Sequence, residues 1–209
     1  VVAAALHPDP KVAMEEAENW DYPITGYTSY VDMIEAESKK PVGERVDYVV
    51  VVTPNHVHFD PSLKCVQAGI PVFCEKPLAI NNATAQQMAT TVKHAGVIHQ
   101  VGLILNYSPV FTVLASLMQA QDFGPLLAAH LRDDQCFPVD GQYGSSWRAD
   151  VERAGGGTLI EHSIHDVDLM RRLFGEISAV SCSTRETSGH PGIEDVAQVT
   201  FHHDSGHTS

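Results

Sequence analysis

Basic residues are scarce in this sequence, and no apolar run is long enough to cross a bilayer. Lysine and arginine number 13 against 26 aspartate and glutamate residues, so the formal net charge is −13. A chain with this charge repels nucleic acid and anionic lipid, and the sequence therefore predicts no nucleic-acid partner and no membrane partner. The apolar residues 1–6 lack a basic flank, so they predict neither a signal peptide nor a membrane segment.

Cysteine is also scarce, and the histidines lack the spacing of a metal site. A chain of 209 residues can bury a core without disulfides, so the few, widely spaced cysteines predict free thiols and a cytoplasmic location. Several of the 12 histidines crowd the last part of the chain without Cys/His ligand spacing, which favours a solvated segment over a metal site. The cysteines are Cys65, Cys74, Cys136 and Cys182.

Strand-like and helix-like segments alternate through the first half of the chain. Residues 46–52 (VDYVVVV) are apolar at nearly every position, as a central parallel strand covered on both faces requires. The alternation predicts βαβ units and an α/β fold with a Rossmann-type, doubly wound parallel sheet. The predicted strands lie at residues 1–7, 46–52, 71–74 and 97–105, and the predicted helices at 11–20, 30–37, 61–68 and 84–95.

The order of elements changes after Asn106. Helices and strands no longer alternate regularly, and this order predicts an α+β domain. We therefore predict a dinucleotide-binding domain at residues 1–106 and a second domain at residues 107–209. In the second domain the predicted helices lie at 110–120 and 159–174, the strands at 126–133, 179–184 and 196–203, and an aromatic loop at 138–149.

Elements expected at the edges of such domains are not found in the sequence. The first strand of a doubly wound sheet leads into a glycine-rich turn, whereas residues 1–7 lead into Pro8-Asp9-Pro10. The last residues, DSGHTS, are typical of a hairpin turn. We therefore expect the first strand with its glycine-rich loop, and further C-terminal strands, to be missing from these 209 residues.

Two polar clusters follow predicted strands of the first domain. Thr53-Pro54-Asn55-His56-Val57-His58 follows the most apolar strand, and Glu75-Lys76-Pro77 follows the next strand along the chain. Parallel strands end at one edge of a sheet, where ligands bind, so both clusters are candidates for a ligand site. A lysine in this place can stabilise a substrate alkoxide. Alternatively, the first cluster is a turn with a capping Asn55, and Lys76 belongs to a surface ion pair.

A third cluster lies in the second domain, where three glycines precede the helix predicted at residues 159–174. On that helix Glu161 and His165 lie one turn apart, and Asp168 and Arg172 continue the same face. A carboxylate beside an imidazole fixes its tautomer and raises its basicity, as a general acid–base near neutral pH requires. The cluster therefore predicts Glu161 and His165 as a catalytic pair.

The same helix allows two other interpretations. His162 and His165 could bind a metal, but they are three residues apart, a third ligand is not evident, and the H-E-x-x-H order is not present. We therefore predict no metal site. A helix with ordinary i, i+4 side-chain pairs and only a structural role is the plainer alternative.

Four strings together resemble the Gfo/Idh/MocA oxidoreductase family, and their order and spacing match it across nearly the whole chain: TPNHVHFDPSLKCVQAGIPVFCEKPLAI, VGLILNYSPVF, SSWRADVERAGGGTLIEHSIHDVDLMRRLFGE and GIEDVAQVTF. The resemblance implies a Rossmann domain, then an α+β domain whose large, open, mostly antiparallel sheet forms a homodimer or homotetramer interface. It also implies NAD or NADP as cofactor, and hydride transfer to or from a hydroxyl carbon of a sugar, inositol or related polyol.

The resemblance also implies roles for single residues. Lys76 matches the family's active-site lysine, whose Lys-Pro peptide can be cis, and His165 matches the histidine that exchanges the hydroxyl proton. Glu161 stands where many relatives have aspartate and is expected to orient His165. The positions that line the nicotinamide half of the cofactor site are Thr53, Pro54, Asn55, His56 and Glu75. The candidates for substrate binding are Asn106, Tyr143, Trp147, Arg148 and His162, although Trp147 can equally be a packing residue of its loop.

Three departures from the family pattern concern the ligand sites. The 209 residues contain no G-x-G-x-x-G turn, on which the dinucleotide pyrophosphate normally rests. His7 stands where an acidic residue often holds the adenosine ribose, so the sequence does not separate NAD from NADP. Asn106 stands where many relatives have arginine. An alternative is therefore a truncated or non-catalytic member that binds a sugar-like ligand or has a structural role.

Overall fold

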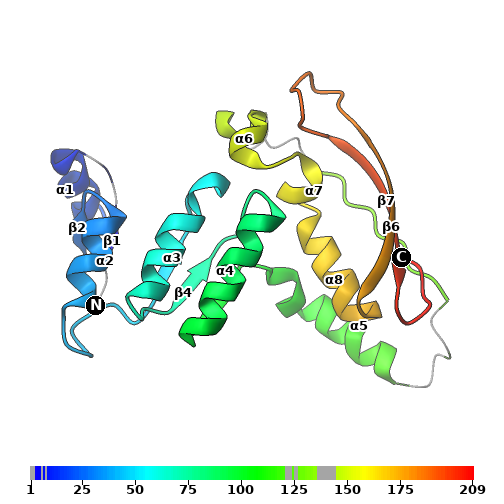
Figure 1. The fold of residues 1–209 in the computed structure, drawn as a ribbon, viewed down its shortest axis with the longest axis horizontal. Coiled ribbons are helices and arrows are strands. Elements are labelled where there is room, and N and C mark those ends of the chain that lie inside the picture. The colour runs from blue at the N-terminus through cyan, green and yellow to red at the C-terminus, as the bar shows by residue number, and fades with distance from the viewer. Residues whose placement is uncertain (1–2, 6, 8, 121–123, 125–126, 136–144) are drawn as a thin grey trace. The chain divides into compact units, whose positions relative to one another are not determined.

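The computed structural model describes residues 3–5, 7, 9–120, 124, 127–135 and 145–209 (Figure 1). The chain divides into two compact units, of which the first holds residues 1–53 and 57–101 and the second holds residues 54–56 and 102–209. The short segment 54–56 thus belongs to the second unit although its neighbours on both sides belong to the first. A domain boundary at residue 106 stays a prediction.

The first unit contains two groups of parallel strands. β1 (Ala3–Ala5) pairs with β2 (Thr25–Tyr27), and the central β4 (Val72–Cys74) pairs with β3 (Val49–Val51) and β5 (His99–Val101). Four helices connect these strands: α1 (Pro10–Glu18), α2 (Tyr30–Ser38), α3 (Phe59–Gln67) and α4 (Asn82–Ala95). This βαβ order confirms the predicted Rossmann-type α/β fold.

The parallel strands form two separate sheets because no described strand joins β1 to β3. In the doubly wound order 3-2-1-4-5-6, β1 and β2 correspond to strands 2 and 3. Strands β3, β4 and β5 correspond to strands 4, 5 and 6. The gap thus falls at the place of strand 1 in that order, which none of the described strands occupies.

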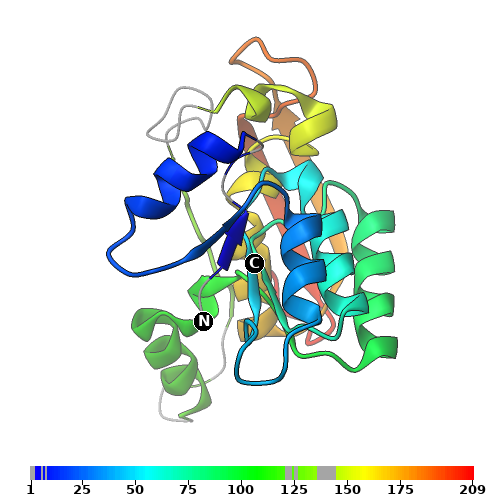
Figure 2. The same ribbon diagram turned by 90° about the vertical axis from the view of Figure 1, so that its left-hand side faces the viewer.

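Helices α2, α3 and α4 stand side by side, whereas α1 lies on the other side of β1 and β2 from α2 (Figure 2). The two faces of β3 differ as a result. Val49 and Val51 are buried, whereas Val50 is 48% and Val52 71% exposed. The prediction that residues 46–52 are covered on both faces is therefore wrong for this structure, because the three neighbouring helices cover one face.

A buried apolar cluster ties the helices of the first unit to its strands. Burial of these side chains is the main stabilising term for such a unit. Local signals also agree with the observed helix ends, because Ser29 and Asn81 cap α2 and α4 through their side chains, and Gly96 ends α4 in the left-handed region with φ of 64°. The cluster consists of Met33, Ile34, Val46, Val49, Val51, Cys65, Val66, Ile70, Val72, Cys74 and Val92.

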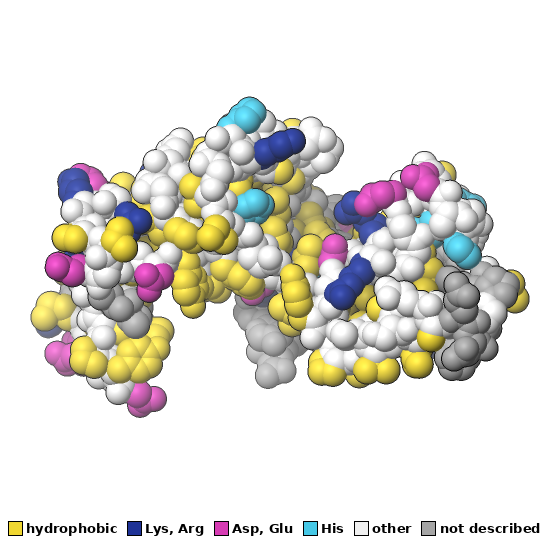
Figure 3. Space-filling view, turned by 90° about the horizontal axis from the view of Figure 1, so that it is seen from below, with side chains coloured by type: hydrophobic (Ala, Val, Ile, Leu, Met, Phe, Trp, Pro, Cys, Tyr) yellow, Lys and Arg dark blue, Asp and Glu magenta, His cyan; other side chains and the backbone are white. Residues whose placement is uncertain are grey.

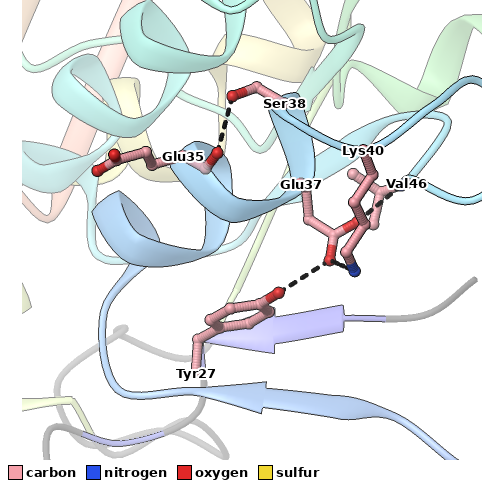
Figure 4. A network of polar contacts seen from close by, with 6 residues as sticks. All are labelled: Tyr27, Glu35, Glu37, Ser38, Lys40 and Val46. Atoms are coloured by element: carbon pink, nitrogen blue, oxygen red, sulfur yellow. Dashed lines mark hydrogen bonds and ion pairs between the residues drawn. The ribbon is translucent and has the colours of Figure 1, made fainter.

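A buried carboxylate links α2 to β2 and to the segment before β3 (Figure 4). Glu37 is fully buried and accepts hydrogen bonds from Tyr27 Oη at 3.0 Å, Lys40 Nζ at 2.6 Å and the Val46 backbone N–H at 3.0 Å. Burial alone raises the pKa of Glu37, but the three donors outweigh it and hold the pKa below its usual value. The charge is therefore stabilised where it is buried.

Replacing Glu37 with glutamine is expected to lower the free energy of unfolding by about 1–3 kcal/mol, because an amide leaves Lys40 without its counter-charge. A lowered carboxyl pKa stabilises the fold above the unfolded pKa. The difference between variant and parent should therefore shrink as the pH falls through the lowered pKa of Glu37. Urea unfolding of variant and parent at two pH values measures this difference in unfolding free energy. Glu35→Gln, which breaks the exposed Glu35–Lys39 pair, is the matched control and should leave stability unchanged.

The second unit combines helices with an antiparallel hairpin. Strands β6 (Ile177–Arg185) and β7 (Val196–His203) pair antiparallel, with an irregularity between Ile177 and Ala179. Leu169, Met170 and Phe174 form the buried core of this unit. The helical elements are η2 (Ile104–Tyr107), α5 (Pro109–Gln119), η4 (Ser146–Ala149), α6 (Val151–Ala154), α7 (Thr158–Glu161) and α8 (Ile164–Phe174).

Two predicted elements of the second unit are wrong. Residues 127–133 form no strand, and Leu127 is 84% exposed, although the Ala129 N–H donates to the Thr208 carbonyl at 3.3 Å. The helix predicted at 159–174 is interrupted between α7 and α8, because the backbone N–H groups of His162 and Ser163 both bond the Thr158 carbonyl. Glu161 and His165 therefore belong to different helices. Only two strands of the expected large sheet lie within the described residues.

Apolar side chains remain exposed on α5. They include Val110, Val113, Leu114 and Leu117, and Val110 is 69% exposed. Figure 3 views the molecule from below and shows apolar side chains on this surface. None of the described helices is both long enough and apolar enough to cross a membrane.

Candidate active site

The predicted ligand residues of the first unit follow two paired strands. β3 and β4 run parallel with Val51 opposite Cys74, so Thr53 and Lys76 both lie just beyond the same edge of the sheet. The Glu75 N–H donates to the Val51 carbonyl at 2.9 Å and extends the ladder by one residue. The Lys76–Pro77 peptide is cis, as the resemblance allows.

His58, the last residue of the first polar cluster, was given no role of its own by the sequence and lies between these strand ends. His58 is 1% exposed, with Nδ1 2.7 Å from the Pro77 carbonyl oxygen and Nε2 2.7 Å from the Thr53 carbonyl oxygen. It immediately precedes α3, and its backbone carbonyl accepts from Ser62 N–H in the first turn. One buried ring thus bonds the backbone after β3 and the backbone after β4.

In the second unit a buried carboxylate is held from two sides. Glu161 is 4% exposed, and its Oε1 accepts from Asn55 Nδ2 at 2.5 Å while its Oε2 accepts from Arg148 Nε at 2.9 Å. Asn55 Nδ2 also donates to the Ala154 carbonyl at 3.0 Å. The Arg148 guanidinium lies 4.4 Å from the centre of the Trp147 ring. The sequence predicted that Glu161 pairs with His165. In the structure the Glu161 carboxylate accepts hydrogen bonds from Arg148 and Asn55.

The glycine run makes a second contact, partly buried, that the sequence did not reveal. The Glu194 carboxylate accepts from the Gly157 N–H at 2.7 Å and from the Leu159 N–H at 2.9 Å, and the Glu194 carbonyl accepts from the Thr158 N–H at 2.7 Å. These bonds satisfy the free N–H groups at the start of α7. The only signal for Glu194 was its place in the string GIEDVAQVTF.

The backbone of the glycine run explains why side chains are excluded there. Gly155 has φ of 91°, a left-handed value that ends α6. A Cβ on Gly157 would lie 1.9 Å from the Glu194 carbonyl oxygen, far inside contact distance. Close backbone approach therefore requires glycine at position 157.

His165 lies in the first turn of α8 and is partly buried, as is His162 at the junction with α7. Asn106 Nδ2 donates to Asp168 in the middle of α8, and the Asn106 carbonyl accepts from Arg172. Asn106 thus connects η2 to the helix that carries His165. Its Oδ1 is buried without a protein partner among the described residues.

The remaining predicted residues divide into two groups. Buried Thr53 Oγ1 and His56 Nδ1 have no protein partner in the described part of the chain, so they retain hydrogen-bonding capacity for a ligand. His7 is exposed and its Nδ1 accepts from the Asp9 N–H at 3.0 Å, which occupies that nitrogen locally. Tyr143 lies outside the described residues. No group of three or more potential ligands suited to a metal ion is found among the residues that are described.

A carboxyl group beside His165 has an unusual pKa. Burial, and secondarily the negative charge of Asp133, raise the pKa of Asp166 to about 6, although a hydrogen bond from Ser163 opposes the shift. Replacing Asp166 with asparagine should remove this unfavourable charge. A raised carboxyl pKa costs stability as the pH rises from the unfolded value of about 4 to about 6.

At pH 8 we therefore expect the free energy of unfolding of Asp166→Asn to exceed that of the parent by about 1 kcal/mol, after allowance for the partial exposure of Asp166. The variant should then unfold at a higher temperature. The two proteins should converge below about pH 3, where Asp166 is protonated in both the folded and the unfolded state. Thermal unfolding across this range is the measurement. Parallel stability profiles of variant and parent would contradict the assignment.

Two family models match almost the entire chain. Residues 1–103 match the model described as oxidoreductase family, NAD-binding Rossmann fold, and residues 111–209 match the GFO/IDH/MocA C-terminal domain. With the parallel sheet of the first unit and the antiparallel hairpin of the second, these matches place the protein in a class of two-domain Rossmann oxidoreductases. The chain belongs to the Gfo/Idh/MocA family.

Relatives with names of known activities match parts of the chain. The scyllo-inositol 2-dehydrogenase (NAD(+)) of Bacillus subtilis is 33% identical over 138 residues, which is 65% of this chain and 38% of that protein. The 2,7-anhydro-N-acetylneuraminate hydratase of Escherichia coli is 33% identical over 132 residues, which is 63% of this chain and 34% of that protein. The chain thus matches little more than a third of either relative's length.

Solved structures confirm the fold. An inositol dehydrogenase homologue from Azotobacter vinelandii, complexed with NAD+, superposes with a TM-score of 0.86 at 23% identity, over 100% of this chain and 55% of that one. Levoglucosan dehydrogenase, complexed with NADH and levoglucosan, gives a TM-score of 0.79 at 24% identity, over 99% of this chain and 55% of that one. At these identities the likeness shows the fold alone.

Proposed function

We propose that this protein is an NAD- or NADP-dependent oxidoreductase that acts on a hydroxyl carbon of a sugar, inositol or related polyol. The observation that carries the proposal is the pair Lys76 and His165 in a chain whose two halves match the two domains of the Gfo/Idh/MocA family. Lys76 follows strand β4 of the Rossmann unit, and His165 opens helix α8 of the second unit. Both residues carry groups that the reaction needs.

In the proposed mechanism each side chain has one task. His165 accepts the hydroxyl proton of the substrate during oxidation and returns it during reduction. The Lys76 ammonium stabilises the alkoxide that develops as the proton leaves. With Asn55 donating to one oxygen of Glu161 and Arg148 to the other, that carboxylate is held as an acceptor. This arrangement supports an orienting role for Glu161 rather than proton transfer.

The described residues fit the nicotinamide half of a dinucleotide. Thr53 Oγ1 and His56 Nδ1 keep buried hydrogen-bonding capacity after strand β3, beside Pro54 and Asn55, and Glu75 follows β4. A bound nicotinamide supplies the carbon that accepts or donates the hydride. The pyrophosphate half has no G-x-G-x-x-G turn in these 209 residues. His7 at the end of β1 is proposed to face the adenosine ribose and leaves NAD and NADP as equal candidates.

The test combines ligand binding with two activity measurements. Thermal-shift titration with NAD and with NADP should show stabilisation, since a ligand that binds only the folded state stabilises it. Inositols, anhydrosugars and other polyols should then change absorbance at the reduced-nicotinamide band. Because one relative is named a hydratase, product analysis by NMR should run in parallel and would reveal turnover without net reduction of the cofactor.

The alternative proposal is a non-catalytic family member that binds a sugar-like ligand or has a structural role. Stabilisation by polyols without stabilisation by either nucleotide would favour this alternative and count against catalysis.

Substrate-binding roles are proposed for Asn106, Tyr143, Trp147, Arg148 and His162. A homodimer or homotetramer through the β6–β7 sheet is supported by the exposure of β6, where Val180 is 56% exposed. The free thiols of Cys65, Cys74 and Cys182 support a cytoplasmic location. Sedimentation velocity of the parent and of Val180→Lys tests the interface.

A further inference from the structure

The ring of His58 is placed between two groups that can only accept hydrogen bonds. Its Nδ1 lies 2.7 Å from the carbonyl oxygen of Pro77, and its Nε2 lies 2.7 Å from the carbonyl oxygen of Thr53. A neutral imidazole carries one N–H and one lone pair. At such a distance a lone pair facing a carbonyl oxygen is repelled, so only a ring with protons on both nitrogens satisfies both contacts.

Another buried histidine of the chain provides a comparison. His203 is 3% exposed, with Nδ1 2.8 Å from the Gly175 carbonyl oxygen and Nε2 2.8 Å from the Ser209 hydroxyl. A hydroxyl can donate as well as accept, so a neutral His203 ring satisfies both neighbours. The doubly protonated form is therefore required at His58 and not at His203, although both rings are buried and have two contacts.

The segment held by His58 carries Lys76. On one side of Lys76, the Glu75 N–H bonds the Val51 carbonyl at 2.9 Å. On the other side Pro77 has no N–H, and its carbonyl is the group that the His58 ring binds. The Lys76 backbone is therefore fixed before the residue by the sheet and after it by His58.

We propose that His58, protonated at both ring nitrogens, is a positioning residue that fixes Lys76 by joining the backbone after β4 to the backbone after β3. The role of Lys76 in the reaction rests on the proposed function, whereas the state of the ring and the placement of Lys76 do not. His58 itself touches neither substrate nor cofactor in this proposal. It acts through the Pro77 and Thr53 carbonyls.

The first experiment needs no substitution. In protein labelled with ¹⁵N-histidine, the His58 ring should show two protonated nitrogens at neutral pH, with N–H protons protected from exchange with water. The His203 ring should show one protonated nitrogen under the same conditions. We call this link, in which one doubly protonated ring donates to the Pro77 and Thr53 carbonyls, the His58 clamp. A His58 ring with one unprotonated nitrogen would overturn the clamp.

The second experiment separates the two links by a matched pair of variants. The amide nitrogen of asparagine can replace Nδ1 and keep the link to Pro77, whereas that of glutamine can replace Nε2 and keep the link to Thr53. If His58 positions Lys76 through Pro77, His58→Gln should lower kcat by about 10- to 100-fold with KM nearly unchanged. His58→Asn keeps the Pro77 link but breaks the Thr53 link, so its kcat should fall at least about threefold less than that of His58→Gln. A general loss of packing would affect both variants alike.

A third measurement does not depend on activity. The rate of Lys76 acylation by an amine-reactive ester, followed by mass spectrometry, should change at least about threefold in His58→Gln and by less in His58→Asn. Lys93, exposed near the end of α4, is the internal reference. His203→Asn removes an equally buried ring from the second unit and should leave the rate of Lys76 acylation unchanged.

The outcomes separate this proposal from the proposed function. The parent protein could lack oxidoreductase activity and still have a doubly protonated His58 and a Lys76 acylation rate that depends on the Pro77 link. That result would refute the function and support the clamp. Equal Lys76 rates in folded His58→Gln, His58→Asn and parent protein would overturn the clamp. If either variant does not fold, the ring nitrogens of the parent still decide whether the clamp exists.

Discussion

Replacing His165 with glutamine is expected to lower kcat/KM of the proposed reaction by about 10³-fold, because a positioned acid–base group contributes about 10²–10⁴-fold. Glutamine keeps a polar side chain at the start of α8 but does not exchange a proton near neutral pH. Replacing Lys76 with methionine removes the ammonium and keeps a flexible apolar chain after β4. The loss of one stabilising donor for the developing alkoxide should cost about 10²–10³-fold.

Steady-state kinetics of both variants and of the double variant provide the measurement. Side chains that act on one chemical step are non-additive, so the double variant should lose far less than the product of the two single losses. Affinity for the dinucleotide, measured by thermal shift, should stay within about threefold in Lys76→Met and His165→Gln. Retention of a third or more of the parent rate by either variant would contradict its assignment as catalytic.

Gly157→Ala is expected to be the most destabilising single change outside the buried cores. The added Cβ would lie 1.9 Å from the Glu194 carbonyl oxygen and 2.5 Å from the Glu194 backbone nitrogen. Backbone cannot rotate away as a flexible side chain can, so either the glycine run or the segment before β7 must move. Such a shift would break the three hydrogen bonds that join Glu194 to residues 157–159.

The expected loss in unfolding free energy is about 4 kcal/mol or more, which is the range of severe backbone and overpacking effects. Gly189→Ala is the matched control, because Gly189 has φ of 81° but nothing within 4 Å of an added Cβ. That variant bears only the left-handed strain of about 1 kcal/mol. Chemical denaturation of the two variants compares the effects. Equal losses would show that the Glu194 contact does not constrain position 157.

Replacing Glu194 with glutamine provides an independent view of the same contact. Glutamine can still accept from one N–H but places an NH₂ group against the other, so stability should fall less than in Gly157→Ala. The order of the two effects follows from what must move. A side-chain amide can turn, whereas the backbone at 157 and 194 cannot separate without displacing α7.

Periodicity and local signals were sufficient for much of the first unit. Alternating apolar and amphipathic stretches predicted its helices and four of its five strands, whereas β2 (Thr25–Tyr27) was not predicted. The caps Ser29, Asn81 and Gly96 agree with that pattern. The polar residues after β3 and β4 were predictable because every strand of a parallel sheet ends at one edge. Exposure of Val50 was not predictable, since it depends on which faces the helices cover.

In the second unit the same reasoning was less successful. A continuous helix at 159–174 has a consistent apolar stripe, yet His162 and Ser163 interrupt it. Residues 127–133 have the composition of a strand but form none. Strand pairing is decided by segments far away in the chain. The intrinsic preference of a short stretch of sequence carries no information about such distant partners.

The chain's membership of an α/β oxidoreductase family, and the candidacy of Lys76 and His165, follow from sequence order and spacing. The partners of Glu161, the Glu194 contact with the glycine run and the two-sided bonds of His58 follow only from tertiary structure. Asn55 and Glu161 are separated by 106 residues, and Gly157 and Glu194 by 37. Hydrogen bonds over such separations depend on how packed units bring segments together, and no local pattern encodes that arrangement.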